Sequence, residues 1–362
     1  FFHPHPATPD PLWSRGLGDV YKRQNKTMNL ILRMHMPILA TILLVFSATA
    51  ISTNKNLDSY VLGFGSCITE KRDQPIWSAI EKEGVNEFFF MGDNVYGDSE
   101  DGLLQDMKAS YEKQKEIFPE WLFKKKLNAI WDDHDYGKND GGTEYPLKKE
   151  AQKLFLDFWD VKKDDPRRNR EGIYFSEKLK IGDLNVNLIG LDTRYHRSPL
   201  DQTDKPYYPT QDKSKTILGA AQWQWLENEL KKESDLIILV SSIQVIPTEH
   251  IFEKWHNFPH ERIRLLKALN NAKGNVIILS GDRHKAGLYK TGNIIEMTSS
   301  SMNKPISRPI AKLWDIFLKE KDEFLIGEMY SRENYGILSI DKEKVVLNLK
   351  DIDGNTIISE EI

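Results

Sequence analysis

Cysteine is almost absent from this chain, since Cys67 is the single cysteine among 362 residues. An intrachain disulfide framework and a zinc site made of cysteines alone are therefore excluded. Positive charge is not in excess either, because 50 Lys and Arg stand against 54 Asp and Glu, which gives a formal net charge of -4. A nucleic-acid-binding surface needs a basic face, so we expect none here.

Internal repeats, low-complexity tracts and linkers rich in proline and glycine are missing from residues 55–362. The composition is 40% hydrophobic and 29% charged, which is ordinary for a globular protein and excludes long disorder and a coiled coil. We therefore expect one α/β domain over residues 55–362, with a mixed sheet and helices outside it. Nothing in the sequence points to a protein partner.

The first 27 residues differ in character from the rest of the chain. Four prolines fall within the first eleven residues, and the stretch shows no periodicity. We interpret residues 1–27 as a non-native segment read through from upstream sequence, with Met28 as the natural start.

Residues 28–50 are typical of an export signal. Arg33 precedes an uncharged apolar run over Met36–Phe46, and Ala48-Thr49-Ala50 is a cleavage site of small residues. The apolar run is too short for a bilayer-spanning helix, which needs about 20 residues. We expect a periplasmic or extracellular protein with no membrane span after cleavage; an uncleaved membrane anchor is the alternative.

Short apolar runs predict buried strands, and amphipathic stretches between them predict helices. The expected strands are Tyr60–Phe64, Glu87–Met91, Asn128–Trp131, Ile173–Leu179, Leu184–Leu191, Leu236–Val240, Val276–Leu279, Gly336–Ile340 and Val345–Lys350. The expected helices are Pro75–Lys82, Gly102–Ile117, Leu147–Trp159, Ala220–Lys232 and Glu261–Ala272.

Polar side chains that can bind ligands follow six of these strands directly. The segments are Gly65 through Cys67, Gly92 through Asp98, Asp132 through Asp140, Asp192 through Arg197, Ser241 through Gln244 and Ser280 through His284. Ligands of open α/β sheets bind beyond the carboxyl ends of the strands. We therefore expect these segments to meet at one rim and to form a site.

The chemistry of these segments favours metal binding. Asp93, Asp133 and Asp282 offer hard anionic oxygens, and His284 offers an imidazole. Without a cation, so many carboxylates at one rim would repel one another, and their pKa values would rise. The sequence therefore predicts a metal site at the rim.

Cys67 and Tyr96 could add a thiolate and a phenolate, which would favour two or more cations, one of them a strong Lewis acid such as Fe(III). Each residue alone also has an ordinary interpretation, because a lone cysteine is commonly a small buried side chain. Arg194 could form a structural ion pair or clamp an anion. The six segments together favour the site.

These residues resemble the PhoD-like alkaline phosphatase D family of the calcineurin-like metallophosphoesterase superfamily. The matching segments are Phe64 through Cys67, Gly92 through Asp98, Trp131 through Asp140, Leu191 through Arg194, Leu218 through Glu227, Ser241 through Gln244, Gly281 through His284 and Glu296 through Ser300. The resemblance implies a four-layer αββα sandwich with mixed β-sheets and a metal cluster at its rim. It also implies Fe(III) with Ca²⁺ as cofactors; a divalent pair such as Mn²⁺ or Zn²⁺ is the alternative.

The resemblance further implies a role for each matching residue. Metal ligands are expected at Cys67, Asp93, Tyr96, Asp133, Asn139, Asp282 and His284. By the resemblance, Asp93 is expected to bridge the metals and His134 to be the catalytic histidine, which we expect to act as general acid. From the residues themselves we also expect Arg194 to clamp the phosphate and Asn94 to bind substrate. Gln244 stands where the superfamily often has a ligating histidine.

We therefore expect an exported, metal-dependent phosphatase or phosphodiesterase that uses a metal-activated water on a phosphate-ester substrate. Two alternatives stay open. One is a membrane-anchored enzyme acting on phospholipid or cell-wall phosphodiesters, and the other is an inactive secreted binding module that metals stabilise. The stretch Pro247–Pro259 could line the mouth of the pocket or be a packed surface loop.

Overall fold

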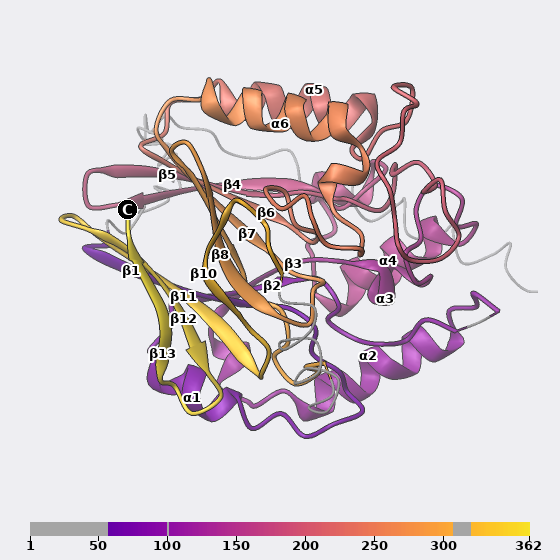
Figure 1. Ribbon diagram of the computed structural model, residues 1–362. Helices are drawn as coiled ribbons and strands as arrows, with labels where there is room; N and C mark the ends of the chain where they lie inside the picture. Colours follow the sequence, from indigo (N-terminus) through magenta and orange to yellow (C-terminus); the bar gives the residue numbers. More distant parts are fainter. Residues whose placement is uncertain (1–56, 100, 307–319) are drawn as a thin grey trace, which may run out of the picture. The chain divides into compact units, whose positions relative to one another are not determined.

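The computed structural model describes residues 57–99, 101–306 and 320–362 (Figure 1). The expected read-through segment at 1–27 and the expected export signal at 28–50 lie outside these residues. No helix in the described part of the chain combines the length and the apolar character that a bilayer span requires.

Helices and strands follow one another along the described chain. The helices are α1 (Trp77–Lys82), α2 (Gln105–Ile117), α3 (Asp133–Tyr136), α4 (Lys148–Phe158), α5 (Gly219–Leu230) and α6 (Pro259–Asn270). The strands of the first sheet are β1 (Ser59–Gly65), β2 (Glu87–Met91), β3 (Lys126–Ile130), β11 (Asn334–Asp341), β12 (Val345–Asp351) and β13 (Thr356–Glu361). Those of the second sheet are β4 (Phe175–Ile181), β5 (Leu184–Gly190), β6 (Leu236–Ser241), β7 (Asn275–Ser280), β8 (Ala286–Thr291), β9 (Ile294–Thr298) and β10 (Leu325–Tyr330).

Both sheets are mixed. The first has the order β13-β12-β11-β1-β2-β3, and the second has the order β10-β8-β9-β7-β6-β5-β4. Strands β1, β2 and β3 run parallel because helices connect them, and β5, β6, β7 and β9 are also parallel. Antiparallel strands complete both sheets. The carboxyl ends of the parallel strands are the ends from which the polar segments emerge.

The side chains of β2 show how the first sheet packs against helices on its outer face and against the second sheet on its inner face. Phe88 and Phe90 point outward and pack edge-on or tilted against Trp77 of α1, with ring centroids 5.3 and 5.9 Å apart. Phe89 points the other way and stacks on Phe175 of β4, in the second sheet, at 5.9 Å. Successive side chains of a strand point to opposite faces, so a run of three phenylalanines serves two layers.

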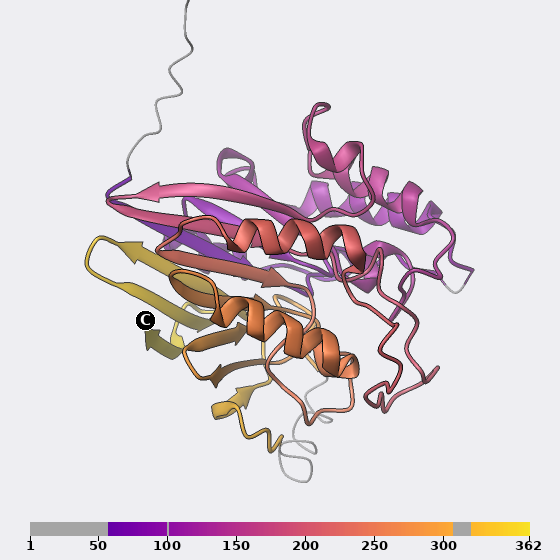
Figure 2. The same cartoon turned by 90° about the horizontal axis from the view of Figure 1, so that it is seen from above.

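The second sheet repeats this arrangement on its own outer face. In β6, Ile238 and Val240 belong to the core shared with the first sheet, whereas Ile237 and Leu239 pack in a separate core beneath α5 and α6. Figures 1 and 2 show these two helices side by side over the sheet. The expected four-layer αββα sandwich is confirmed.

Every strand and helix that the sequence predicts is present, with ends shifted by a few residues. Strands β8, β9, β10 and β13 are not among the strands that the sequence predicts. Strand β10 is an edge strand with mostly exposed or half-buried side chains, so it carries no apolar run. The four-residue helix α3 is also unexpected, because a single turn is too short to give a periodic pattern.

Candidate active site

The loops that follow the parallel strands bring their acidic, thiol and imidazole groups together at one rim. Three sets of potential ligand atoms each lie within 4.8 Å of one another. The sets are Cys67 with Asp93 and His284, Asp93 with Asp133 and His134, and Asp132 with Asp133 and Asp282. Because Asp93 and Asp133 each belong to two sets, the three sets form one continuous cluster.

Asp93 lies at the centre of this cluster, and its side chain is only 1% exposed. One carboxylate oxygen, Oδ2, accepts a hydrogen bond from the Tyr96 hydroxyl at 2.9 Å and lies 3.4 Å from Cys67 Sγ. The other, Oδ1, is buried with no hydrogen-bond partner. Burial raises the pKa of Asp93 to about 6, against the opposing charge of His134. A bound cation would satisfy the free oxygen and stabilise the anion.

Cys67 and Tyr96 are buried beside Asp93. Burial, reinforced by the negative charge of Asp93, raises the pKa of both side chains well above their usual ranges. The thiol and the phenol are therefore neutral unless a cation lies between them, and a cation would favour both anions. This donor set fits a metal ion.

The backbone of the cluster is held in a costly conformation. Cys67, Asp93, Asp282 and His284 all have positive φ angles, of 56°, 50°, 69° and 51°. Side chains other than glycine adopt this left-handed region rarely, and such strain gathers at functional sites where the surrounding structure enforces it. Four of the seven non-glycine residues with positive φ in the described chain are expected metal ligands.

Glycine at position 92 allows the loop after β2 to approach the loop after β3. Gly92 has a φ of 105°, and a Cβ atom there would lie 2.6 Å from Cβ of Asp132. Any larger residue would push the two loops apart. The cluster therefore requires a glycine directly before Asp93.

Asp133 and Asp282 occupy different electrostatic environments within the cluster. Burial opposes ionisation of Asp133, but His134, Arg194 and the amide of Asp140, which donates to Asp133 Oδ2 at 2.7 Å, hold its pKa below the usual range. Burial raises the pKa of Asp282 well above its usual range, and the charge of Asp133 adds to this shift. Two such carboxylates ionise together only when a cation compensates them.

Asp135 ties the loop after β2 to the loop after β3. Its carboxylate accepts hydrogen bonds from the backbone amides of Asp132, Asp93 and Asn94, at 2.6, 3.2 and 3.3 Å. The sequence motifs predict no role for Asp135, although it belongs to the run of four ionisable residues after β3, Asp132 through Asp135. Asn94 is fully buried, and its amide nitrogen donates to the Ile130 carbonyl at 2.9 Å, while its Oδ1 has no partner.

His134 lies at the edge of the cluster and is partly open to solvent. Its Nδ1 is 2.7 Å from Asp98 Oδ1, and both side chains are slightly less than one-fifth exposed. Burial acts against protonation, but Asp133, Asp93 and Asp98 together raise the pKa of His134 to about 10. The imidazole is therefore oriented by one carboxylate and can donate a proton.

His284 shows the arrangement typical of a metal-binding histidine. Its Nδ1 hydrogen-bonds the carbonyl oxygen of Lys304, which leaves Nε2 for a metal ion. Burial lowers the pKa of His284 to about 4, so the ring is neutral, as a metal ligand must be.

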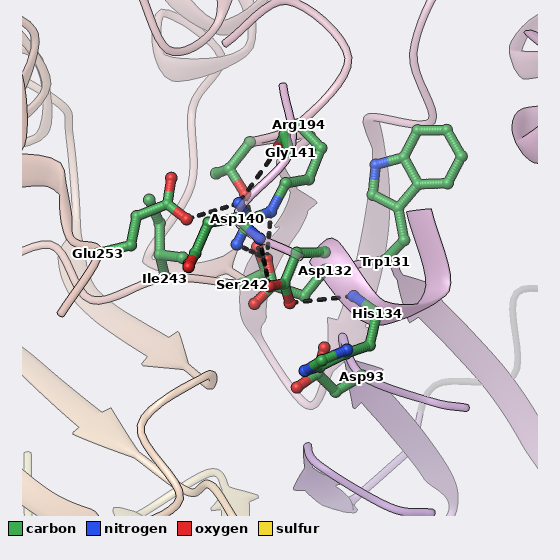
Figure 3. A network of polar contacts seen from close by, with 12 residues as sticks. Asp93, Trp131, Asp132, His134, Asp140, Gly141, Arg194, Ser242, Ile243 and Glu253 are labelled. Carbon is green, nitrogen blue, oxygen red and sulfur yellow. Dashed lines mark hydrogen bonds and ion pairs between the residues drawn. The ribbon is translucent and has the colours of Figure 1, made fainter. Parts of the chain in front are cut away.

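Arg194 does not lie where a phosphate clamp would be expected. Its side chain is completely buried, Nε donates to Asp132 Oδ1 at 2.6 Å, and Nη1 donates to Glu253 Oε2 at 2.6 Å (Figure 3). The Asp132 oxygen also accepts from the Ser242 hydroxyl at 2.6 Å. Arg194 thus neutralises carboxylates behind the cluster and is better described as a positioning residue.

We expect replacement of Arg194 by Met to destabilise the fold rather than to weaken substrate binding. The change leaves the buried Asp132 carboxylate without its ion pair, whereas Glu253 keeps a second one with Arg197 at 2.9 Å. Breaking a buried pair from one side costs about 3–5 kcal/mol in the free energy of unfolding. Urea unfolding measures this cost. The control is Lys273→Met, which breaks the exposed ion pair with Glu233 and should cost less than about 1 kcal/mol. An Arg194 variant of unchanged stability but raised KM would restore the clamp role.

Two other expected residues lie apart from the cluster. Asn139 is exposed, and its amide donates to Asp140 Oδ2 at 2.8 Å, so this geometry does not support its expected role as a metal ligand. Gln244 is buried, and its amide donates to Thr298 Oγ1 at 2.7 Å. In the stretch Pro247–Pro259, Trp255 and Phe258 are packed in the core beneath α5 and α6.

A model of the PhoD-like phosphatase family matches residues 126–309. The chain belongs to the PhoD-like phosphatase family. It is accordingly a hydrolase of phosphoric esters, as the sequence analysis expected. The matched range contains Asp133, His134, Asp282 and His284, whereas Cys67 and Asp93 precede it.

Solved structures agree with this PhoD-like fold. The structure of PhoD aligns with a TM-score of 0.66 at 16% identity, over 85% of this chain and 69% of that chain. GAP50, the anchor in the inner membrane complex of Plasmodium, aligns with a TM-score of 0.56 at 14% identity, over 84% of this chain and 88% of that chain. At such low identities the likeness shows the fold alone. No curated protein matches this PhoD-like chain significantly.

Proposed function

We propose that this PhoD-like chain is an exported, metal-dependent phosphatase or phosphodiesterase whose rim cluster binds Fe(III) and Ca²⁺. The observation that carries the proposal is the buried, partnerless Oδ1 of Asp93 at the junction of thiol, phenol, imidazole and carboxylate groups. A buried anionic oxygen without a partner is costly, and a cation removes that cost.

The donor types divide the cluster into two halves of different metal preference. Cys67, Asp93 and His284 offer sulfur, oxygen and nitrogen, and Tyr96 adds a phenol, which together suit an iron ion. Asp132, Asp133 and Asp282 offer only oxygen, which suits calcium. A pair of divalent ions such as Mn²⁺ or Zn²⁺ is the alternative.

The cations, when bound, supply Lewis acidity and a nucleophilic water for attack at phosphorus. The residues of the chain do the rest. His134 donates a proton to the leaving oxygen, and Asp98 fixes the orientation of its ring. Asp135 holds the loops of Asp93 and Asp132 in register. Asn94 is fully buried, its Nδ2 donates to the Ile130 carbonyl and to Asp135, and its free Oδ1 can only accept a hydrogen bond, so this geometry does not support the expected contact with a phosphate oxygen.

Export would suit this chemistry. Calcium sites of extracellular proteins are weak, with dissociation constants of about 0.1–1 mM, and fill only where calcium is abundant. The proposed signal at residues 28–50 would deliver the protein to such a compartment. Retention in the membrane fraction would favour the anchored phosphodiesterase instead.

Metal analysis of two matched variants tests the proposal. We expect Cys67→Ser to lose iron and keep calcium, because an alcohol is a far poorer anionic ligand than a thiol. We expect Asp282→Asn to lose calcium and keep iron. Chelation of the wild type should abolish turnover of a chromogenic phosphodiester, and added Ca²⁺ should restore it.

Two results would contradict parts of this proposal. Stoichiometric zinc without iron, in protein from metal-balanced medium, would remove the iron assignment. A fully metal-loaded wild type that turns over neither phosphomonoesters nor phosphodiesters would favour the inactive binding module.

A further inference from the structure

A pocket of about 330 Å³ opens beside the proposed general acid. Its lining consists of Thr69, Lys71, Arg72, Tyr96, Asp98, His134 and Lys304. Three of these side chains are cationic, and the one carboxylate, Asp98, is engaged by His134 at 2.7 Å. The pocket is therefore basic, although the neighbouring cluster is acidic.

The wall of this basic pocket is built from two loops that a buried side chain ties together. Asn303 is 6% exposed. Its Oδ1 accepts from the Thr69 amide at 2.7 Å, and its Nδ2 donates to the Thr69 carbonyl at 2.9 Å. Thr69 and the two cations after it are thereby fixed against Lys304, which follows Asn303. The three cationic side chains are thus presented by a constrained backbone.

The cations are oriented mainly by uncharged groups. Lys304 Nζ lies 3.1 Å from the centroid of the Tyr96 ring, and Lys71 Nζ donates to the Tyr96 carbonyl at 2.7 Å. Arg72 Nη1 donates to the Asn303 carbonyl at 3.3 Å. Within the described chain, Arg72 and Lys304 form no ion pair with a carboxylate, and Lys71 has only Glu70 at 3.9 Å. Among the described residues, most of the donors of these three side chains have no partner other than those named here, so they can bind an anion.

We propose that this basic pocket binds a second anionic group, a carboxylate or a phosphate, carried by the leaving group of the substrate. The inference rests on the proposed function in one respect, namely that His134 protonates the leaving oxygen. Because His134 lines the pocket, the leaving group occupies it when the phosphorus lies at the cluster. In the hydrolysis itself the bond from phosphorus to the leaving oxygen breaks, water supplies the new oxygen, and His134 supplies the proton.

Matched substrates separate binding of the anion from the hydrolysis. Three aryl methyl phosphodiesters have leaving groups that differ only in the meta substituent, which is a carboxylate, a phosphonate or a neutral carboxamide. We expect kcat/KM of the wild type to favour the two anionic substrates over the neutral one. The preference should weaken as salt is added, since exposed charges are screened.

The variants Arg72→Gln and Lys71→Gln report on the pocket. We expect each to reduce the ratio of anionic to neutral kcat/KM by about tenfold, mainly through KM, as for loss of one charge-assisted contact. The matched control is Lys290→Met, which removes an exposed cation of β8 and should leave the ratio unchanged. Circular dichroism confirms that each variant is folded.

The outcomes distinguish this inference from the proposed function. In one outcome, the wild type turns over all three substrates while neither variant changes the ratio of anionic to neutral kcat/KM. That result overturns the anion pocket and leaves the proposed hydrolase function intact. The variants can also lower kcat/KM relative to the neutral substrate for only one of the two anionic substrates. That result supports the pocket and identifies its ligand as a carboxylate or as a phosphate. Absence of wild-type turnover of all three, with metals bound, overturns the proposed function and the inference together.

Discussion

Replacement of Asp93 by Asn should remove both metal ions and lower kcat/KM by about 10³-fold or more. Asp93 belongs both to the set proposed to hold iron, with Cys67 and His284, and to the set that includes Asp133 and His134. Loss of a residue that only supports a ligand already costs about 10–100-fold in metal affinity or activity. An amide cannot supply the negative charge that two neighbouring cations require, so the effect of a central ligand should be larger.

The measurement combines metal analysis with steady-state kinetics on one chromogenic phosphodiester. Asp106→Asn is the matched control, because Asp106 is an exposed residue at the start of α2 and should change neither quantity. Full retention of both metals by the Asp93 variant would remove Asp93 from the bridging position. Loss of one metal only would show that the second ion is held by Asp132, Asp133 and Asp282 without Asp93.

Replacement of His134 by Ala should lower kcat by an amount that depends on the leaving group of the substrate. An alkyl leaving group needs a proton, so its kcat should fall by about 10²–10⁴-fold, the usual contribution of a general acid. A p-nitrophenolate leaves without a proton, and its kcat should fall by less than about tenfold. Asp98→Asn should give the same pattern in weaker form, because Asp98 orients the ring.

Metal content decides how the His134 result is interpreted. His134 lies within ligand distance of Asp93 and Asp133, so the variant is analysed for metals alongside the kinetics. Loss of metal in step with activity would make His134 a ligand. Equal loss for both leaving groups, with the metals retained, would assign the acid to another residue. His196→Ala is the control, since His196 lies outside the cluster and 4.0 Å from Glu171.

The strands of the sandwich could be predicted because their apolar runs are local. Glu87–Met91 and Leu236–Val240 are buried on both faces, and a strand of this kind is apolar at nearly every position. The edge strand β10 could not be predicted, because an exposed edge imposes no pattern. The division of Phe88, Phe89 and Phe90 between two cores was likewise invisible until the second sheet was in place.

The candidate cluster could be predicted for a similar reason. Parallel strands of one sheet end at one rim, so the positions after β1, β2 and β3 converge. The position after β7 belongs to the second sheet and joins them because the two sheets pack with these ends at the same side. Cys67, Asp93, Asp133 and His284 were found by this rule and are close together. Asn139 follows α3 rather than a strand end, and it is exposed. The position of Asn139 in the sequence, close to Asp133, therefore did not predict where its side chain lies.

The sequence by itself determined the fold class, the family and the residue types gathered at the rim, because strand patterns and strand-end motifs depend on neighbouring residues. Only the tertiary structure decided what Arg194 and Lys304 do. Arg194 follows a strand end as the ligands do, yet it faces Asp132 and Glu253 from behind and is fully buried. Lys304 belongs to no motif that the sequence analysis singled out, yet it lies over Tyr96 in the open pocket. Burial and charge pairing are set by contacts between segments far apart in the chain, and these contacts exist only once the two sheets have packed.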